Sequence, residues 1–151
     1  MSGRRAACGV VAAALVAAVS SCGGSSHSIS KPEYVTRASA VCRDADRAVN
    51  AVRGDATDTT ALATSIGRVL SIERDAVKRV RAIPPPRADE PALDHWLDLV
   101  DRSLDEVDDA RQASEHGDAA AAAAANARGA DLAQQATEAA RAYGITACVT
   151  G

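Results

Sequence analysis

Five aspartates recur at alternating spacings of four and three residues: Asp94, Asp98, Asp101, Asp105 and Asp108. At helical periodicity they form one acidic stripe. Rows of carboxylates can bind hard divalent cations, but tight calcium sites wrap ligands from a loop around the ion, which a straight helix cannot do. We therefore predict no metal site and interpret the stripe as a solvated face paired with Arg74, Arg79 and Arg81. The alternative is a face on which a basic partner protein docks.

Two neighbouring residues could add to a functional site. Trp96 lies at the edge of the apolar stripe of the same segment, so it is either a core residue or a partly exposed hot spot beside the aspartates. Glu73 falls near the middle of another apolar stripe, where it would pair with an arginine or be displaced to the rim. Buried carboxylates cluster at functional sites, but we expect a structural role.

Residue patterns typical of catalysis are missing from the sequence. It contains no nucleophile elbow, no zinc-binding HExxH, no phosphate-binding glycine loop and no free cysteine beside a histidine. We therefore predict that the protein is not an enzyme, has no catalytic residues and uses no cofactor.

Val19-Ser20-Ser21-Cys22 resembles the lipobox of a bacterial lipoprotein precursor. Arg4 and Arg5 form a positive n-region, and residues 6–19 form an apolar segment too short to span a membrane. The resemblance implies a diacylglyceryl group on the Cys22 thiol, cleavage between Ser21 and Cys22, and often N-acylation of the new amine. Cleavage by the ordinary signal peptidase, with Cys22 left as a thiol, is the alternative.

The lipobox divides the chain into a signal peptide (1–21), a lipidated cysteine with a flexible tether (22–30) and a domain (31–151). The expected location is the extracytoplasmic face of the cell membrane, with the lipid as anchor. A formal net charge of −3 and only three aromatic residues argue against nucleic acid as a partner.

Four cysteines have separate expected fates. Cys8 leaves with the signal peptide and Cys22 takes the lipid, so Cys42 and Cys148 are left in an oxidising compartment. Two such thiols indicate one disulfide. A metal pair is the alternative, but no histidine lies at a ligand spacing from either cysteine.

Four segments have the apolar periodicity of amphipathic helices. The first follows Ser30 as N-cap and ends near Gly54, with Ala48 among its expected inner residues. The others cover about 60–82, 89–114 and 118–143, the last with Ala121 on its inner face. Short connections, one of them the stiff Pro84-Pro85-Pro86, predict an all-α fold. We expect an antiparallel up-and-down four-helix bundle with its C-terminal tail disulfide-linked to helix one.

The chain also resembles a family of actinobacterial secreted or lipid-anchored helical proteins of unknown function. The shared features, in order, are Lys31-Pro32-Glu33-Tyr34, Cys42, the proline-rich loop, Trp96-Leu97, and Tyr143-Gly144-Ile145 before Cys148. The resemblance covers about residues 30–151. It supports the pairing of Cys42 with Cys148 and implies no catalytic residue.

These observations lead to two functional hypotheses. The first is a membrane-anchored helical module that engages an envelope protein partner or senses envelope conditions. The second is a carrier of a small ligand or lipid, with an apolar cavity inside a core rich in alanine.

Overall fold

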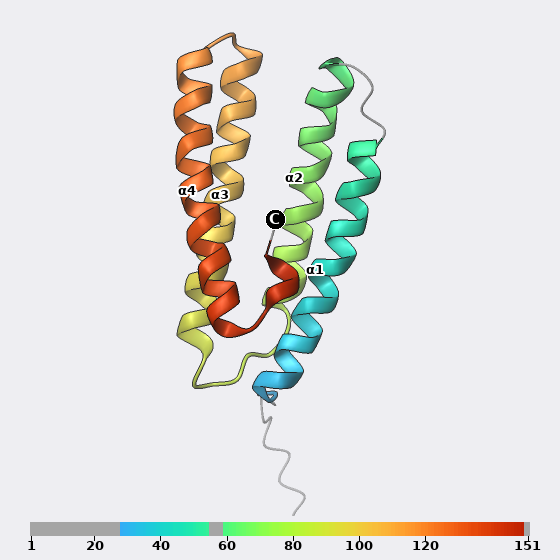
Figure 1. Cartoon of the computed structure of the whole chain (residues 1–151), viewed down its shortest axis with the longest axis vertical. Helices are drawn as coiled ribbons and strands as arrows, with labels where there is room; N and C mark the ends of the chain where they lie inside the picture. The colour runs from blue at the N-terminus through green and yellow to red at the C-terminus, as the bar shows by residue number, and fades with distance from the viewer. Residues whose placement is uncertain (1–27, 55–58, 150–151) are drawn as a thin grey trace, which may run out of the picture.

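The computed structural model describes residues 28–54 and 59–149, and it has the predicted four-helix architecture. Helices α1 (Lys31–Gly54), α2 (Thr59–Arg81), α3 (Glu90–Glu115) and α4 (Ala119–Tyr143) run alternately up and down (Figure 1). A short 3₁₀ helix, η1 (Thr146–Cys148), follows α4. The prediction of an antiparallel all-α bundle is thus confirmed.

Local capping chemistry explains several helix ends. Asp118 accepts a hydrogen bond from the Ala121 amide at 2.9 Å and so caps α4. At the start of α1 the Glu33 amide donates a hydrogen bond to the Ser30 hydroxyl at 3.4 Å. The Glu33 carboxylate accepts a hydrogen bond from the Arg37 guanidinium and so does not complete a capping box. Gly144 adopts a φ of 101° after α4, a conformation that favours glycine.

The helices form two antiparallel hairpins, α1–α2 and α3–α4 (Figure 1). The α2 and α3 helices join the hairpins, whereas the described backbones of α1 and α4 do not pack against each other. The C-terminal tail lies between them instead, with η1 in contact with both helices. The Cys42–Cys148 disulfide holds this tail on α1 and confirms the predicted pairing.

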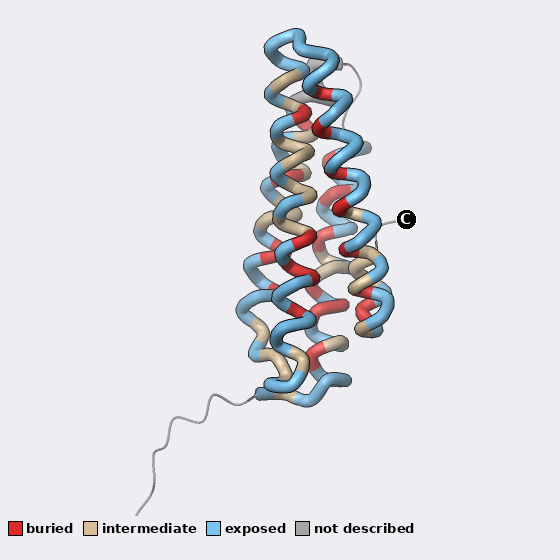
Figure 2. Tube along the Cα trace, turned by 90° about the vertical axis from the view of Figure 1, so that its left-hand side faces the viewer, coloured by how far each residue is buried: buried red, intermediate tan, exposed pale blue. Residues whose placement is uncertain are grey.

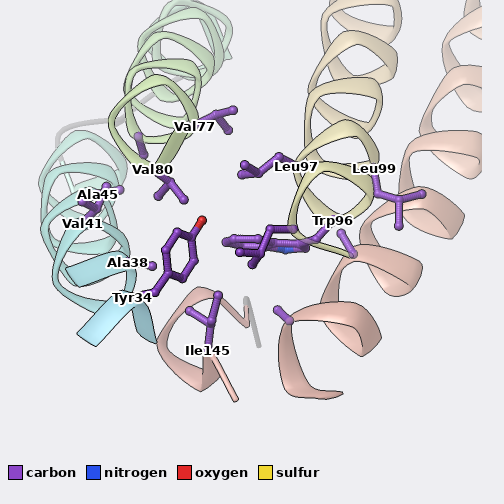
Figure 3. Close-up of a cluster of buried hydrophobic side chains, with 14 of the residues drawn as sticks. Tyr34, Ala38, Val41, Ala45, Val77, Val80, Trp96, Leu97, Leu99 and Ile145 are labelled. Carbon is purple, nitrogen blue, oxygen red and sulfur yellow. The ribbon is translucent and has the colours of Figure 1, made fainter. Parts of the chain in front are cut away.

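The core lies along the inward faces of all four helices (Figure 2). At its lower end Tyr34, Val80, Trp96 and Ile145 converge from α1, α2, α3 and the tail (Figure 3). Tyr34 and Ile145 are the largest fully buried side chains among the described residues. The tail is therefore part of the core.

The α3 and α4 helices approach each other closely because α4 presents small residues. A Cβ placed on Gly129 would lie 3.2 Å from the Glu106 Cβ and 3.6 Å from the Ser103 carbonyl oxygen. The Ser103 hydroxyl donates a hydrogen bond to the Gly129 carbonyl at 3.2 Å. Close backbone packing thus replaces interlocking large side chains, as the alanine content of α4 predicts.

Some predicted inner positions were wrong by one residue. In α1, Ala48 is exposed and Val49 is buried, and in α4, Ala121 is exposed while Ala122 is buried. Consecutive residues of a helix point about 100° apart, so in both places the structure buries the opposite flank of the predicted apolar stripe. The buried Leu99 was also missed, because α3 packs against both α2 and α4 and so buries more than one stripe.

Candidate functional site

A cavity of about 340 Å³ lies between the two hairpins and is partly open to solvent. We call it the hairpin groove. Its walls come from all four helices, and Cys148 contributes from η1. The groove lies beside the tail, where the described backbones of α1 and α4 do not pack against each other.

The walls of the hairpin groove are mainly aliphatic. The apolar lining residues of α2 and α3 are Val69, Leu70, Ala76, Val77, Val80, Trp96, Leu97, Val100, Leu104 and Val107. Val69, Val100, Leu104 and Val107 are only half-buried, although their periodicity predicts inner positions. These side chains therefore present apolar surface that the protein itself does not fully cover.

Trp96 lies in the wall of the groove and also in the core cluster shown in Figure 3. Trp96 is 4% exposed, which confirms that it is a core residue and not a partly exposed hot spot. It therefore adds no surface to the acidic stripe. As the single tryptophan of the chain, it is a natural fluorescent reporter of groove contents. Cys42 and Cys148 also border the groove, so the disulfide fixes part of its wall.

Among the described residues, three with charged side chains line the hairpin groove: Asp46 and Arg53 from α1, and Glu73 from α2. Glu73 is half-buried and forms no hydrogen bond or ion pair within the described part of the chain. Burial raises the pKa of its carboxyl, the Asp46 carboxylate raises it further, and Arg53 partly opposes both effects. Of the two alternatives for Glu73, the described residues provide no arginine pair, and the half-buried position in the groove wall fits displacement to the rim of the core.

Most of the acidic stripe is engaged with arginines. Arg74 contacts Asp105 at 3.0 Å and also Asp108, and Arg81 pairs with Asp101. Hydrogen bonds from Arg111 hold the pKa of Asp108 below its usual range. Of the three predicted arginine partners, Arg79 differs, because it pairs with Asp44 on α1.

The N-terminal end of the stripe, formed by Asp94 and Asp98, has fewer arginine contacts than the rest. Asp98 has only a 3.8 Å contact with Arg102, and Asp94 forms no ion pair with any described residue. Both carboxylates are exposed. The stripe is thus largely neutralised by its neighbours, as the solvated-face interpretation predicts.

Three of the residues behind the family resemblance, Lys31, Tyr34 and Tyr143, form a cluster at the base of the bundle. The Tyr143 hydroxyl donates to Asp89 at 2.8 Å, and the Tyr143 and Tyr34 rings form an edge contact at 6.0 Å. The Lys31 ammonium lies 4.2 Å from the centre of the Tyr143 ring. Burial raises the pKa of Tyr34 to about 12, which fits a structural role for this cluster.

Metal binding, membrane crossing and the lipobox are the remaining features that the sequence raised. Within residues 28–54 and 59–149, no three histidine, cysteine or acidic side chains are grouped as a metal site would need. No helix in the described segments is long and apolar enough to cross a membrane. The lipobox, with Ser21 and Cys22, lies outside the described residues.

Comparisons of the chain with protein-family models, with curated proteins and with solved structures found no match.

Sequence reasoning foresaw a cavity only in general terms, from the alanine content of the core. The position of the groove depends on the tail lying between α1 and α4, and this long-range packing has no local sequence signal. Glu73 was the residue of the sequence that indicated where the groove lies. It is a carboxylate within an apolar stripe, and in the structure it lines one wall of the groove.

Proposed function

We propose that this protein is a non-catalytic, lipid-anchored binding protein of the extracytoplasmic membrane face, which holds a small apolar ligand in the hairpin groove. The observation that carries the proposal is the groove itself, a partly open apolar cavity of about 340 Å³. Small-molecule sites are typically concave, mainly apolar clefts of about 300–1,000 Å³ with a few polar groups. The groove has the size and lining of such a site.

Ligand binding has a physical driving force in this groove. Half-buried aliphatic side chains on α2 and α3 leave apolar surface in contact with water. Each Å² of such surface that a ligand covers contributes about 25 cal/mol before the costs of association. The disulfide fixes part of the groove wall before a ligand arrives, which lowers the cost of ordering the site.

A docking role for the acidic stripe has weaker support. Arg74, Arg81 and Arg111 already neutralise much of its charge, so less field is left to attract a basic envelope protein. Trp96 is buried and adds no hot spot. The groove therefore supports the carrier hypothesis better than the stripe supports the interaction hypothesis.

The location in the proposal depends on the sequence of residues 1–22. A lipid on Cys22 would hold the groove close to the membrane surface, where apolar molecules are concentrated. The chain from residue 23 onward would act as a tethered carrier that samples this surface.

A titration of Trp96 fluorescence with decanol tests the proposal. The Cys22→Ser chain, produced from residue 22 onward, is the material of choice, because it carries neither the lipid nor the apolar segment 6–19. Decanol in the groove should change the emission of the single tryptophan. No saturable change with decanol would contradict a binding groove.

A pair of matched variants identifies the site. Ala133 lines the groove and Ala130 is exposed on the same helix, so Ala133→Phe fills the groove while Ala130→Phe does not. Ala133→Phe should weaken decanol binding about tenfold or more, since it displaces the ligand from its apolar contacts. Equal affinity of the two variants would place binding elsewhere.

A further inference from the structure

Glu73 is poorly satisfied where it lies. It is half-buried in the wall of the hairpin groove, and no described residue donates a hydrogen bond to it or forms an ion pair with it. Desolvating a carboxylate without a partner is unfavourable. A cation that enters the groove can pair with the Glu73 carboxylate, because no described residue of the protein does so.

The charges around the groove favour a cation over an anion. Asp46 and Glu73 contribute two carboxylates, against the single guanidinium of Arg53. The groove linings from α3 and α4 carry polar but uncharged groups, Ser103 and Thr137, and no charged side chain among the described residues. An anionic headgroup would therefore meet net repulsion, and a neutral one would leave Glu73 unpaired.

We propose that the hairpin groove selects lipophilic amines, with the apolar chain against Leu70, Trp96 and Leu104 and the ammonium group paired with the Glu73 carboxylate. This inference rests on the proposed function, because it names the class of ligand for the same groove. Charge complementarity determines which headgroup of the ligand is preferred, and the aliphatic walls determine that its chain is apolar. A charge-assisted hydrogen bond in a half-buried site is stronger than its neutral counterpart.

The test compares three probes that share one chain and differ in headgroup: decylamine, decanol and decanoate. Each is titrated into the Cys22→Ser chain with Trp96 fluorescence as readout. Decylamine should bind about tenfold more tightly than decanol, since a charge-assisted bond is added to equal apolar contacts. Decanoate should bind most weakly.

Two variants separate Glu73 from general electrostatics. Glu73→Gln keeps the shape of the side chain and removes its charge, whereas Asp75→Asn removes one charge from an exposed position on the same helix. Glu73→Gln should abolish the preference for decylamine over decanol, measured as the ratio of the two affinities within the same variant. Asp75→Asn should retain the preference.

The outcomes distinguish this inference from the proposed function. Equal binding of the three probes, or a preference for decanoate through Arg53, would overturn selection of amines but leave the groove as a binding site. A preference for decylamine that survives in Glu73→Gln would overturn the role of Glu73. Binding of none of the probes would overturn both proposals.

Discussion

Glu73 shows how one residue can conflict with the core around it. Its carboxyl lies among aliphatic groove residues beside Asp46, and both burial and that neighbouring charge raise its pKa. The folded state therefore holds the Glu73 proton more tightly than the unfolded chain does. Between the ordinary pKa and the raised pKa, the native state binds more protons, so stability falls as pH rises through this window.

Glu73→Gln should accordingly raise the melting temperature near neutral pH, because glutamine resembles the protonated acid. The advantage should shrink as pH falls through the raised pKa of Glu73, where the wild-type carboxyl becomes protonated. Thermal denaturation of both proteins across this pH range measures the difference, with Asp75→Asn as the control for charge. A destabilised Glu73→Gln at neutral pH would show that the carboxylate has a stabilising partner.

Among the elements, the helices followed closely from local sequence. Asp118 caps α4 at the start of the segment predicted from 118 to 143, and Gly117 and Gly144 follow α3 and α4 with positive φ. The exact buried positions were less predictable, because Ala48 and Val49 are both apolar and lie on opposite flanks of the same stripe, of which the structure buries the Val49 side. Leu99 was missed since its burial depends on α4, a partner that periodicity within α3 cannot reveal.

Two glycines should respond in opposite ways to alanine. A Cβ on Gly67 would have no described neighbour within 4 Å, so Gly67→Ala should stabilise α2 by about 0.5–1 kcal/mol through backbone entropy. Gly144 has a φ of 101°, and Gly144→Ala should cost about 1–2 kcal/mol through backbone strain. Urea denaturation measures both, and a destabilising Gly67→Ala would contradict the absence of close packing around that position.

For the whole molecule, the tail is the part that links stability to the groove. The Ile145 side chain is fully buried, and Cys148 joins Cys42 across a sequence separation of 106 residues. The pairing itself was predictable from the cysteine count and the resemblance. Its consequence, a tail that lies between α1 and α4 and leaves the groove beside it, depends on packing between segments far apart in the chain.

Removal of this disulfide should therefore weaken the whole bundle. The Cys42→Ser, Cys148→Ser double variant should lose about 2–5 kcal/mol of unfolding free energy, since the unfolded chain regains the entropy of a long open loop. Urea denaturation measures the loss, and wild type treated with dithiothreitol should match the variant. Unchanged stability would mean that packing of the tail alone holds it in place.

The lipid anchor is also a property of the whole chain. Intact mass of the membrane-extracted protein should exceed that of a polypeptide beginning at Cys22 by a diacylglyceryl group, commonly with an added acyl chain. Cys22→Ala should lack this mass. An unmodified protein beginning at another residue would contradict the lipobox interpretation.

Native mass spectrometry of protein gently extracted from membranes tests the central claim, that the hairpin groove holds an apolar ligand. Wild type and Ala130→Phe should both carry the same discrete extra mass, and Ala133→Phe should have lost it, because only Ala133 lines the groove. A bare wild-type protein, or an extra mass that all three proteins retain, would contradict the claim.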